Sequence, residues 1–436
     1  MKRHICIFYS VIVVLSIQPY NSMGADAKKL RGKPKAEYLV KADLDHEDGH
    51  YAMGEKATFT FTVTKNGKAL DKGTTLVTFF KNGTKTKGKS IDLSKGNPFS
   101  LSETMDKPGF VDPTLVVNID GKKVHSNNHR PIGAAFDPEK IRAGGVAPAD
   151  LLDYWKGQFE KLNKEVPPNF IIKKVRESKN LVRYTVTCDN FGGTKTYAAI
   201  TMPKGPGPFP MVFSVPPAGN YGYGFFKTPG AIRVTITVFD RLFKAPNSYR
   251  DFNTPIWYFY KGAQKRNTYY YYKAVLGVMR MMDYAEKNIK EWDGKNLVAS
   301  GRSQGGGFAL IMAGLNPKIK GVTADVPALC DHKARLAGRR PGWPQILDNS
   351  ATAKSFSKDA PYFDAANFAS LVTCPAIVSV GFIDTMCVPS SVYAAYNNLK
   401  GEKKIYDCPR YGHGWGFRTN DYDNAVNKFI KDHTSD

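Results

Sequence analysis

Hydrophobic and polar residues alternate along several short segments in the first third of the chain. The clearest are ATFTFTV (57–63), TTLVTFF (74–80) and TLVVNID (114–120), and turns rich in Gly, Asn and Lys separate them. A period of two residues places the apolar side chains on one face of a strand, as in a half-buried antiparallel sheet. We therefore predict a small all-β, immunoglobulin-like sandwich over residues 28–130.

A Pro- and Gly-rich segment and a helix follow this part. Residues 131–147, PIGAAFDPEKIRAGGVA, have the composition of a linker. In residues 148–164, Leu152, Trp155, Phe159 and Leu162 recur at helical spacing. We assign residues 131–165 to a linker and a leading helix.

Strands and helices alternate from about residue 170 to the end of the chain. Segments 182–188 and 196–203 are expected to form a leading antiparallel pair. Apolar strands at 210–217 and 232–239 precede a helix at 269–288, and a further apolar strand is expected at 375–384. Such alternation is typical of a parallel sheet with helices on both faces. We predict one α/β domain over residues 166–436.

The first 27 residues have the features of a secretory signal peptide. Lys2 and Arg3 precede an apolar stretch near Ile7–Ile17, and a small-residue site ends at Ala27. No later segment is long and apolar enough to span a bilayer. We expect export to the periplasm or the extracellular space, without a membrane anchor.

Charge and cysteine content add two expectations. The formal net charge is +23, but the lysines are spread along the chain and no nucleic-acid-binding motif is present. A solvated basic surface is therefore expected, with attraction to an acidic polysaccharide as the alternative and no nucleic-acid partner. Five scattered cysteines follow the predicted signal peptide, which favours buried free thiols over a disulfide framework.

The motif Gly301-x-Ser303-x-Gly305 follows an apolar strand and begins a helix. This is the context of a nucleophile elbow, in which a tight, strained turn presents the serine. A bare motif of this kind also occurs by chance, and the flanking strand and helix favour Ser303 as a nucleophile. A serine hydroxyl then needs a base and an orienting acid.

The acid and the base are sought after the serine, in that chain order. Asp384 ends the apolar strand 375–384, and His413 lies in a Gly-flanked loop after another strand. His332 precedes this acid, and His433 is three residues from the end of the chain. We predict Asp384 and His413, although Asp384 could instead cap a helix and His413 could be an ordinary loop residue.

An oxyanion hole requires two N–H donors. The first is expected to be the backbone N–H of Gln304, which follows the nucleophile. The second is expected in the loop after MVFSV, where Pro216 and Pro217 have no N–H, so that Ala218 is the first candidate and Gly219 the second.

These blocks resemble those of the cephalosporin C deacetylase / acetyl xylan esterase family. GRSQGGG (301–307), GFIDTMCVPSSVYAAYNNLKG (381–401) and YGHGW (411–415) are similar to the family's blocks around its nucleophile, acid and base. The resemblance covers roughly residues 145–436. It implies an α/β-hydrolase fold, Ser303, Asp384 and His413 as the triad, and deacetylation of acetylated sugars through an acyl-serine without metal or other cofactor.

The chain departs from the family pattern at three places. Pro216-Pro217-Ala218 replaces the usual His-Gly-Tyr, Leu242 and Phe243 replace the last two residues of Arg-Gly-Gln, and Gly414 replaces a Glu after the histidine. At the first of these places, Ala218 occupies the position of the family's Tyr, whose backbone N–H is the oxyanion donor. The others leave open the substrate and the assembly, for which a homo-oligomer is one option.

Two insertions, 240–268 and 329–370, are expected to wall the site. Each of their aromatic residues could either pack in a lid or contact the sugar, and Arg339 with Arg340 could meet a uronate carboxylate. The predicted pocket residues are Trp257, Tyr258, Arg339, Trp343 and Trp415.

The sequence thus predicts a secreted serine carboxylesterase that removes acetyl groups from acetylated poly- or oligosaccharide of the xylan type. A glucuronoyl esterase or a prolyl-oligopeptidase-like peptidase would use the same triad. A non-catalytic glycan-binding protein is the alternative outside enzymes. The β-sandwich could serve as a packing module or bind glycan.

Overall fold

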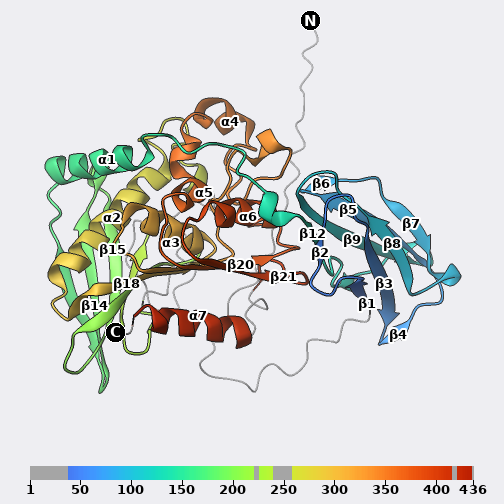
Figure 1. Cartoon of the computed structure of the whole chain (residues 1–436), viewed down its shortest axis with the longest axis horizontal. Helices are drawn as coiled ribbons and strands as arrows, with labels where there is room; N and C mark the ends of the chain where they lie inside the picture. The colour runs from blue at the N-terminus through green and yellow to red at the C-terminus, as the bar shows by residue number, and fades with distance from the viewer. Residues whose placement is uncertain (1–37, 220–224, 239–257, 415–419, 435–436) are drawn as a thin grey trace, which may run out of the picture.

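The computed structural model describes residues 38–219, 225–238, 258–414 and 420–434 (Figure 1). The predicted signal peptide, residues 1–27, lies outside them. No helix in these ranges is both long enough and apolar enough to cross a bilayer.

Two packed sheets form the N-terminal part. Along β3 the buried side chains alternate, with Phe59, Phe61 and Val63 facing inward, as the period of two requires. One sheet has the order β11-β1-β3-β4 with β8 on β3, and the other has the order β2-β12-β9-β5-β6 with β7 on β5 and β10 on β9. The strands are β1 (Tyr38–Leu44), β2 (His50–Tyr51), β3 (Ala57–Lys65), β4 (Lys68–Ala69), β5 (Thr74–Lys81), β6 (Thr84–Lys85), β7 (Lys89–Asp92), β8 (Phe99–Glu103), β9 (Gly109–Ile119), β10 (Lys122–Lys123), β11 (Ser126–Asn127) and β12 (Ala134–Phe136).

The boundary predicted at residue 130 differs from the structure. β12 lies in the segment predicted as linker, yet it pairs antiparallel with β9 and parallel with β2. A three-residue strand is too short to reveal a period of two, and the Pro- and Gly-rich composition around β12 is typical of a linker rather than of a strand. The sandwich therefore extends to about Phe136.

The C-terminal part contains one nine-stranded sheet in the order β13-β14-β15-β17-β16-β18-β19-β20-β21. The pairs from β13 to β17 are antiparallel, and those from β17 to β21 are parallel. Its strands are β13 (Ile171–Glu177), β14 (Leu181–Asp189), β15 (Lys195–Pro203), β16 (Phe209–Val215), β17 (Ile232–Thr237), β18 (Trp292–Arg302), β19 (Gly321–Asp325), β20 (Ala376–Gly381) and β21 (Lys403–Cys408).

Helices cover both faces of this sheet (Figure 1). Val212 and Val298 pack against Ile430 of α7 on one face, whereas Met211 and Phe213 face the larger core on the other. The helices are α1 (Leu151–Glu165), α2 (Tyr270–Asn288), α3 (Gln304–Leu315), α4 (Ser350–Phe356), α5 (Ala365–Ala369), α6 (Pro389–Asn398) and α7 (Asn420–Asp432). An α/β fold preceded by an all-β part is thereby confirmed.

Candidate active site

Ser303 sits on the turn between β18 and α3, in a backbone conformation that L-residues rarely adopt. Its φ is 55° and its ψ is −121°, which marks stored strain. The turn is tight, because a Cβ on Gly301 would lie 2.2 Å from the carbonyl oxygen of Gly305, and a Cβ on Gly305 would lie 2.0 Å from that of Val215. The two glycines are therefore required by close backbone contacts on either side of the serine.

Three residues from separate elements meet at this turn. His413 Nε2 lies 3.0 Å from Ser303 Oγ, and His413 Nδ1 lies 2.8 Å from Asp384 Oδ2. Asp384 is buried, and its Oδ1 accepts hydrogen bonds from the backbone N–H groups of Met386 and Cys387 at 2.8 and 3.0 Å. With Nδ1 protonated, His413 donates to Asp384 and can accept the hydroxyl proton of Ser303 at Nε2.

A buried thiol lies beside this histidine. The ligand atoms of Asp384, Cys387 and His413 all lie within 4.8 Å of one another, and these residue types can bind a divalent metal such as Zn²⁺. Burial opposes protonation of the His413 ring, but Cys387 and Asp384 outweigh burial and raise the pKa of His413 above its ordinary value. Burial also raises the pKa of the Cys387 thiol, which keeps it protonated at neutral pH.

Cys387→Ala is expected to move the acidic limb of the pH profile of kcat/KM to lower pH. His413 must be unprotonated to act as a base, so this limb follows its pKa, and the variant removes the hydrogen bond between Cys387 and His413 that favours the protonated ring. The measurement is kcat/KM for an acetyl ester across about pH 5–9. Cys374→Ala, a half-buried thiol elsewhere, is the control. An unmoved limb would contradict the expectation.

Arg302, next to the serine, links the elbow to the histidine loop. Its Nη2 donates to the carbonyl oxygens of His413 and Gly414 at 2.9 and 3.0 Å. Its Nη1 donates to Asp325 at the end of β19, and Ser379 Oγ donates to the same carboxylate. The Arg302–Asp325 pair is buried, with side chains 9% and 12% exposed.

Arg302→Met is expected to lower the free energy of unfolding by about 3–5 kcal/mol, because it leaves Asp325 as a buried carboxylate without its cation. Urea denaturation measures this loss. Lys287→Met removes the cation of an exposed pair with Asp283 and is expected to cost at most about 0.5 kcal/mol. Equal losses in the two variants would contradict a special contribution of the Arg302 pair.

Gln304 is held by a buried hydrogen-bond network that its position in the sequence does not reveal. Its Oε1 accepts from the hydroxyl groups of Tyr258 and Tyr271, both at 2.6 Å, and its Nε2 donates to the Pro216 carbonyl at 3.3 Å. As the first residue of α3, Gln304 has a backbone N–H without an intrahelical acceptor. The side chain thus ties the predicted first oxyanion donor to the loop that carries Ala218, which is half-buried.

The predicted pocket residues are dispersed. Trp257 and Trp415 lie outside the described residues. Tyr258 is 3% exposed beneath the elbow, which matches packing rather than substrate contact. Arg339 is 6% exposed and pairs with Asp331 at 2.9 Å, so its guanidinium is not available to a uronate. Trp343 is half-buried, and its backbone N–H donates to the carbonyl oxygen of Met386 beside the Asp384 loop.

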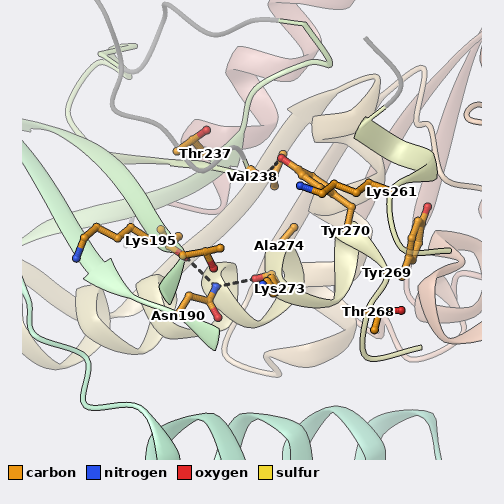
Figure 2. Close-up of a pocket in the computed structure, with 12 residues that line it drawn as sticks. Asn190, Lys195, Thr237, Val238, Lys261, Thr268, Tyr269, Tyr270, Lys273 and Ala274 are labelled. Atoms are coloured by element: carbon orange, nitrogen blue, oxygen red, sulfur yellow. Dashed lines mark hydrogen bonds between the residues drawn. The ribbon is translucent and has the colours of Figure 1, made fainter. Parts of the chain in front are cut away.

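A separate cavity of about 140 Å³ lies by the start of α2 (Figure 2). Its polar groups serve the fold: Asn190 Nδ2 donates to Thr196 Oγ1 and to the Lys273 carbonyl, and the Tyr270 hydroxyl donates to the Val238 carbonyl. The lining residues are Asn190, Thr194, Lys195, Thr196, Thr237, Val238, Lys261, Thr268, Tyr269, Tyr270, Lys273 and Ala274. The cavity is thus distinct from the site around Ser303.

Comparisons with known proteins identify relatives of this chain. A curated relative, Acetyl esterase Axe7A of Xylanibacter ruminicola, is 28% identical over 410 residues, which cover 88% of this chain and 89% of that protein. Acetyl xylan esterase 1 from Thermoanaerobacterium sp. JW/SL YS485 matches with a TM-score of 0.58 at 21% identity, covering 68% of this chain and 98% of its own. Acetyl xylan esterase from Paenibacillus sp. R4 matches with a TM-score of 0.56 at 23% identity and the same coverages.

These structures confirm the predicted α/β-hydrolase fold. A sequence model of the family described as acetyl xylan esterase (AXE1) matches residues 139–433, which is more than half of the chain. The resemblance inferred from the motifs is therefore confirmed. The chain belongs to the acetyl xylan esterase family and is a carbohydrate esterase of the serine hydrolase class.

Proposed function

We propose that Ser303, His413 and Asp384 form the catalytic triad of an enzyme that removes acetyl groups from acetylated xylan or xylo-oligosaccharides. The observation that carries this proposal is the continuous chain of hydrogen bonds from Ser303 Oγ through the His413 ring to Asp384. Ser303 itself lies on the strained elbow between β18 and α3. The family membership supports the ester bond as the target.

The reaction proceeds in two acyl transfers. Ser303 Oγ attacks the acetyl carbonyl carbon while His413 Nε2 takes the hydroxyl proton, and Asp384 stabilises the resulting imidazolium. The backbone N–H groups of Gln304 and Ala218 donate to the oxyanion of the tetrahedral intermediate. The C–O bond to the sugar then breaks, and His413 returns the proton to the leaving sugar hydroxyl.

Water completes the cycle. His413 takes a proton from a water molecule, whose oxygen attacks the acetyl-serine carbonyl. The second tetrahedral intermediate collapses to acetate, and His413 protonates Ser303 Oγ. Each proton removed by the histidine is returned, so the enzyme is restored after one ester and one water are consumed.

We further propose that residues 1–27 act as a signal peptide that directs export to the periplasm or the extracellular space. The β-sandwich and the hydrolase part form the mature chain, which acts alone or as a homo-oligomer.

The deciding experiment compares acyl groups and ester classes. Purified residues 28–436 are assayed with p-nitrophenyl esters from acetate to octanoate, with a methyl glucuronate ester and with a Pro-peptide. Preference for acetate, together with acetate release from acetylated xylan, is the expected result. Preference for the glucuronate ester or the peptide would replace the deacetylase proposal, and xylan binding without any turnover would favour a glycan-binding protein.

A further inference from the structure

The N-terminal sandwich contacts the two loops that carry Asp384 and His413. The N–H of Gly133 donates to the carbonyl oxygen of Pro409, four residues before His413, at 2.8 Å. A Cβ on Gly133 would lie 2.9 Å from both the Cβ and the carbonyl oxygen of Phe382, two residues before Asp384. Only glycine permits this approach, so one backbone segment of the sandwich touches both loops.

Aromatic packing reinforces the contact with the acid loop. The ring of Phe110, on β9, lies 5.1 Å from that of Phe382 and 5.6 Å from that of Tyr393, measured between centroids. Phe110 is 3% exposed and Phe382 is fully buried. Phe110 also belongs to the large core of the hydrolase part rather than to the core of the sandwich. Its ring therefore fills space directly beneath the acid loop.

A polar bridge supports the strand that leads to the histidine loop. His50 Nε2, on β2, lies 3.2 Å from Asp407 Oδ2 on β21. The other oxygen of Asp407 accepts a hydrogen bond from the Tyr393 hydroxyl on α6 at 2.7 Å. Asp407 thus joins the sandwich to β21, which precedes the base, and to α6, which follows the acid.

The acid and base loops are themselves joined by backbone hydrogen bonds. Phe382 N–H donates to the Cys408 carbonyl at 3.1 Å, and Ile383 N–H donates to the Tyr411 carbonyl at 3.3 Å. A displacement of either loop would therefore be transmitted to the other. Because His413 must meet both Ser303 Oγ and Asp384 at hydrogen-bond distance, a small displacement would weaken both contacts.

The surface of the sandwich does not favour the alternative role of glycan binding. Sugars are commonly bound on the exposed faces of aromatic side chains. Within residues 38–136, which the structure describes, no Phe, Tyr or Trp is exposed. Most aromatic residues of the sandwich lie instead in its core or, like Phe110, at the contact with the hydrolase part. Tyr38 and Phe80 are half-buried, and the cationic groups of Lys65 and Arg130 lie over their rings at 5.3 and 5.0 Å from the centroids.

We propose that the N-terminal sandwich is a brace for the acid–base pair, with Phe110 and His50 as positioning residues that act on Asp384 and His413 through Phe382 and Asp407. This inference rests on the proposed function, because it assigns the two loops a catalytic geometry to maintain.

The test compares Phe110→Ala with Phe59→Ala. Both residues are buried phenylalanines of the sandwich, but Phe59 lies in its own core, away from the acid loop. A fluorophosphonate that reacts with Ser303 counts the folded sites, so that kcat per reacted site is independent of any loss of folded protein. Phe110→Ala is expected to lower this kcat by about 10–100-fold with little change in KM, since small misplacements of reacting groups have effects of this order. Phe59→Ala is expected to retain the wild-type value per site.

Equal kcat per site in the two variants would overturn the brace. If Phe110→Ala yields no folded sites, His50→Ala decides, because the His50 side chain is 32% exposed and its removal leaves no large void. A severalfold lower kcat and slower fluorophosphonate reaction support the proposal, and wild-type values overturn it. Ser303→Ala distinguishes failure of the proposed function from failure of the brace. If Ser303→Ala remains active, the proposed function is refuted. If Ser303→Ala is inactive but Phe110→Ala has the wild-type kcat per site, only the brace is refuted.

Discussion

Ser303→Ala is expected to lower kcat for p-nitrophenyl acetate by about 10⁴–10⁶-fold, because loss of the nucleophile removes the acyl-serine route and leaves only substrate binding and the oxyanion donors. The hydroxyl makes one hydrogen bond in the described structure, to His413, so the fold should tolerate its removal. Steady-state kinetics and circular dichroism on the same preparation measure the two expectations separately.

The matched control is Ser300→Ala, three residues earlier on β18. Ser300 is 8% exposed and Ser303 is 7% exposed, but the Ser300 hydroxyl accepts a hydrogen bond from Thr323 within the sheet. Activity of the control should stay near the wild-type value. If Ser303→Ala kept more than about a tenth of the wild-type kcat, another group would have to be the nucleophile.

Asp384→Asn is expected to lower kcat by about 10⁴-fold at neutral pH. The asparagine can keep its carbonyl oxygen toward the N–H groups of Met386 and Cys387, so its amide NH₂ would face His413. An N–H donor there favours the tautomer of His413 that is protonated at Nε2, and this nitrogen can then no longer accept the Ser303 proton. Kinetics with an acetyl ester test the loss.

Asp359→Asn is a suitable control for this change. Asp359 is also a partly buried carboxylate, and it accepts hydrogen bonds from the backbone and side chain of Arg266 away from the elbow. Its variant should lose stability without losing kcat in the folded protein. A small effect of Asp384→Asn on kcat would mean that Asp384 does not orient the base.

The general architecture could be predicted because its signals are local. A period of two marked the sandwich strands, and strand–helix alternation marked the parallel sheet. The structure differs where a strand lacks such a signal. β12 has three residues, all of them buried, and β13 is exposed along its whole length, so neither strand alternates between buried and exposed positions.

The meeting of Ser303, Asp384 and His413 could be predicted because the carboxyl ends of neighbouring parallel strands lie at one edge of a sheet. The contacts that support these three residues could not be predicted, because they join residues far apart in the sequence. Arg302 reaches the carbonyl oxygens of residues 111 and 112 positions away, and Tyr258 reaches Gln304 across 46 positions. The pairing of Arg339 with Asp331 also depends on how the insertion folds, and local composition does not encode that fold. For this reason the sequence placed Arg339 in the pocket, whereas the structure buries its side chain.

The free cysteines have a consequence for how the chain must mature. All five described cysteines are unpaired, and Cys188, Cys330 and Cys387 are buried. Burial raises the pKa of each of these three thiols, which suppresses the thiolate that oxidants attack. In an oxidising compartment, protection of these thiols would therefore depend on folding being completed first. Chain folding and oxidation would compete in time, and a variant that folds slowly would be exposed to wrong disulfides even if its final structure were equally stable.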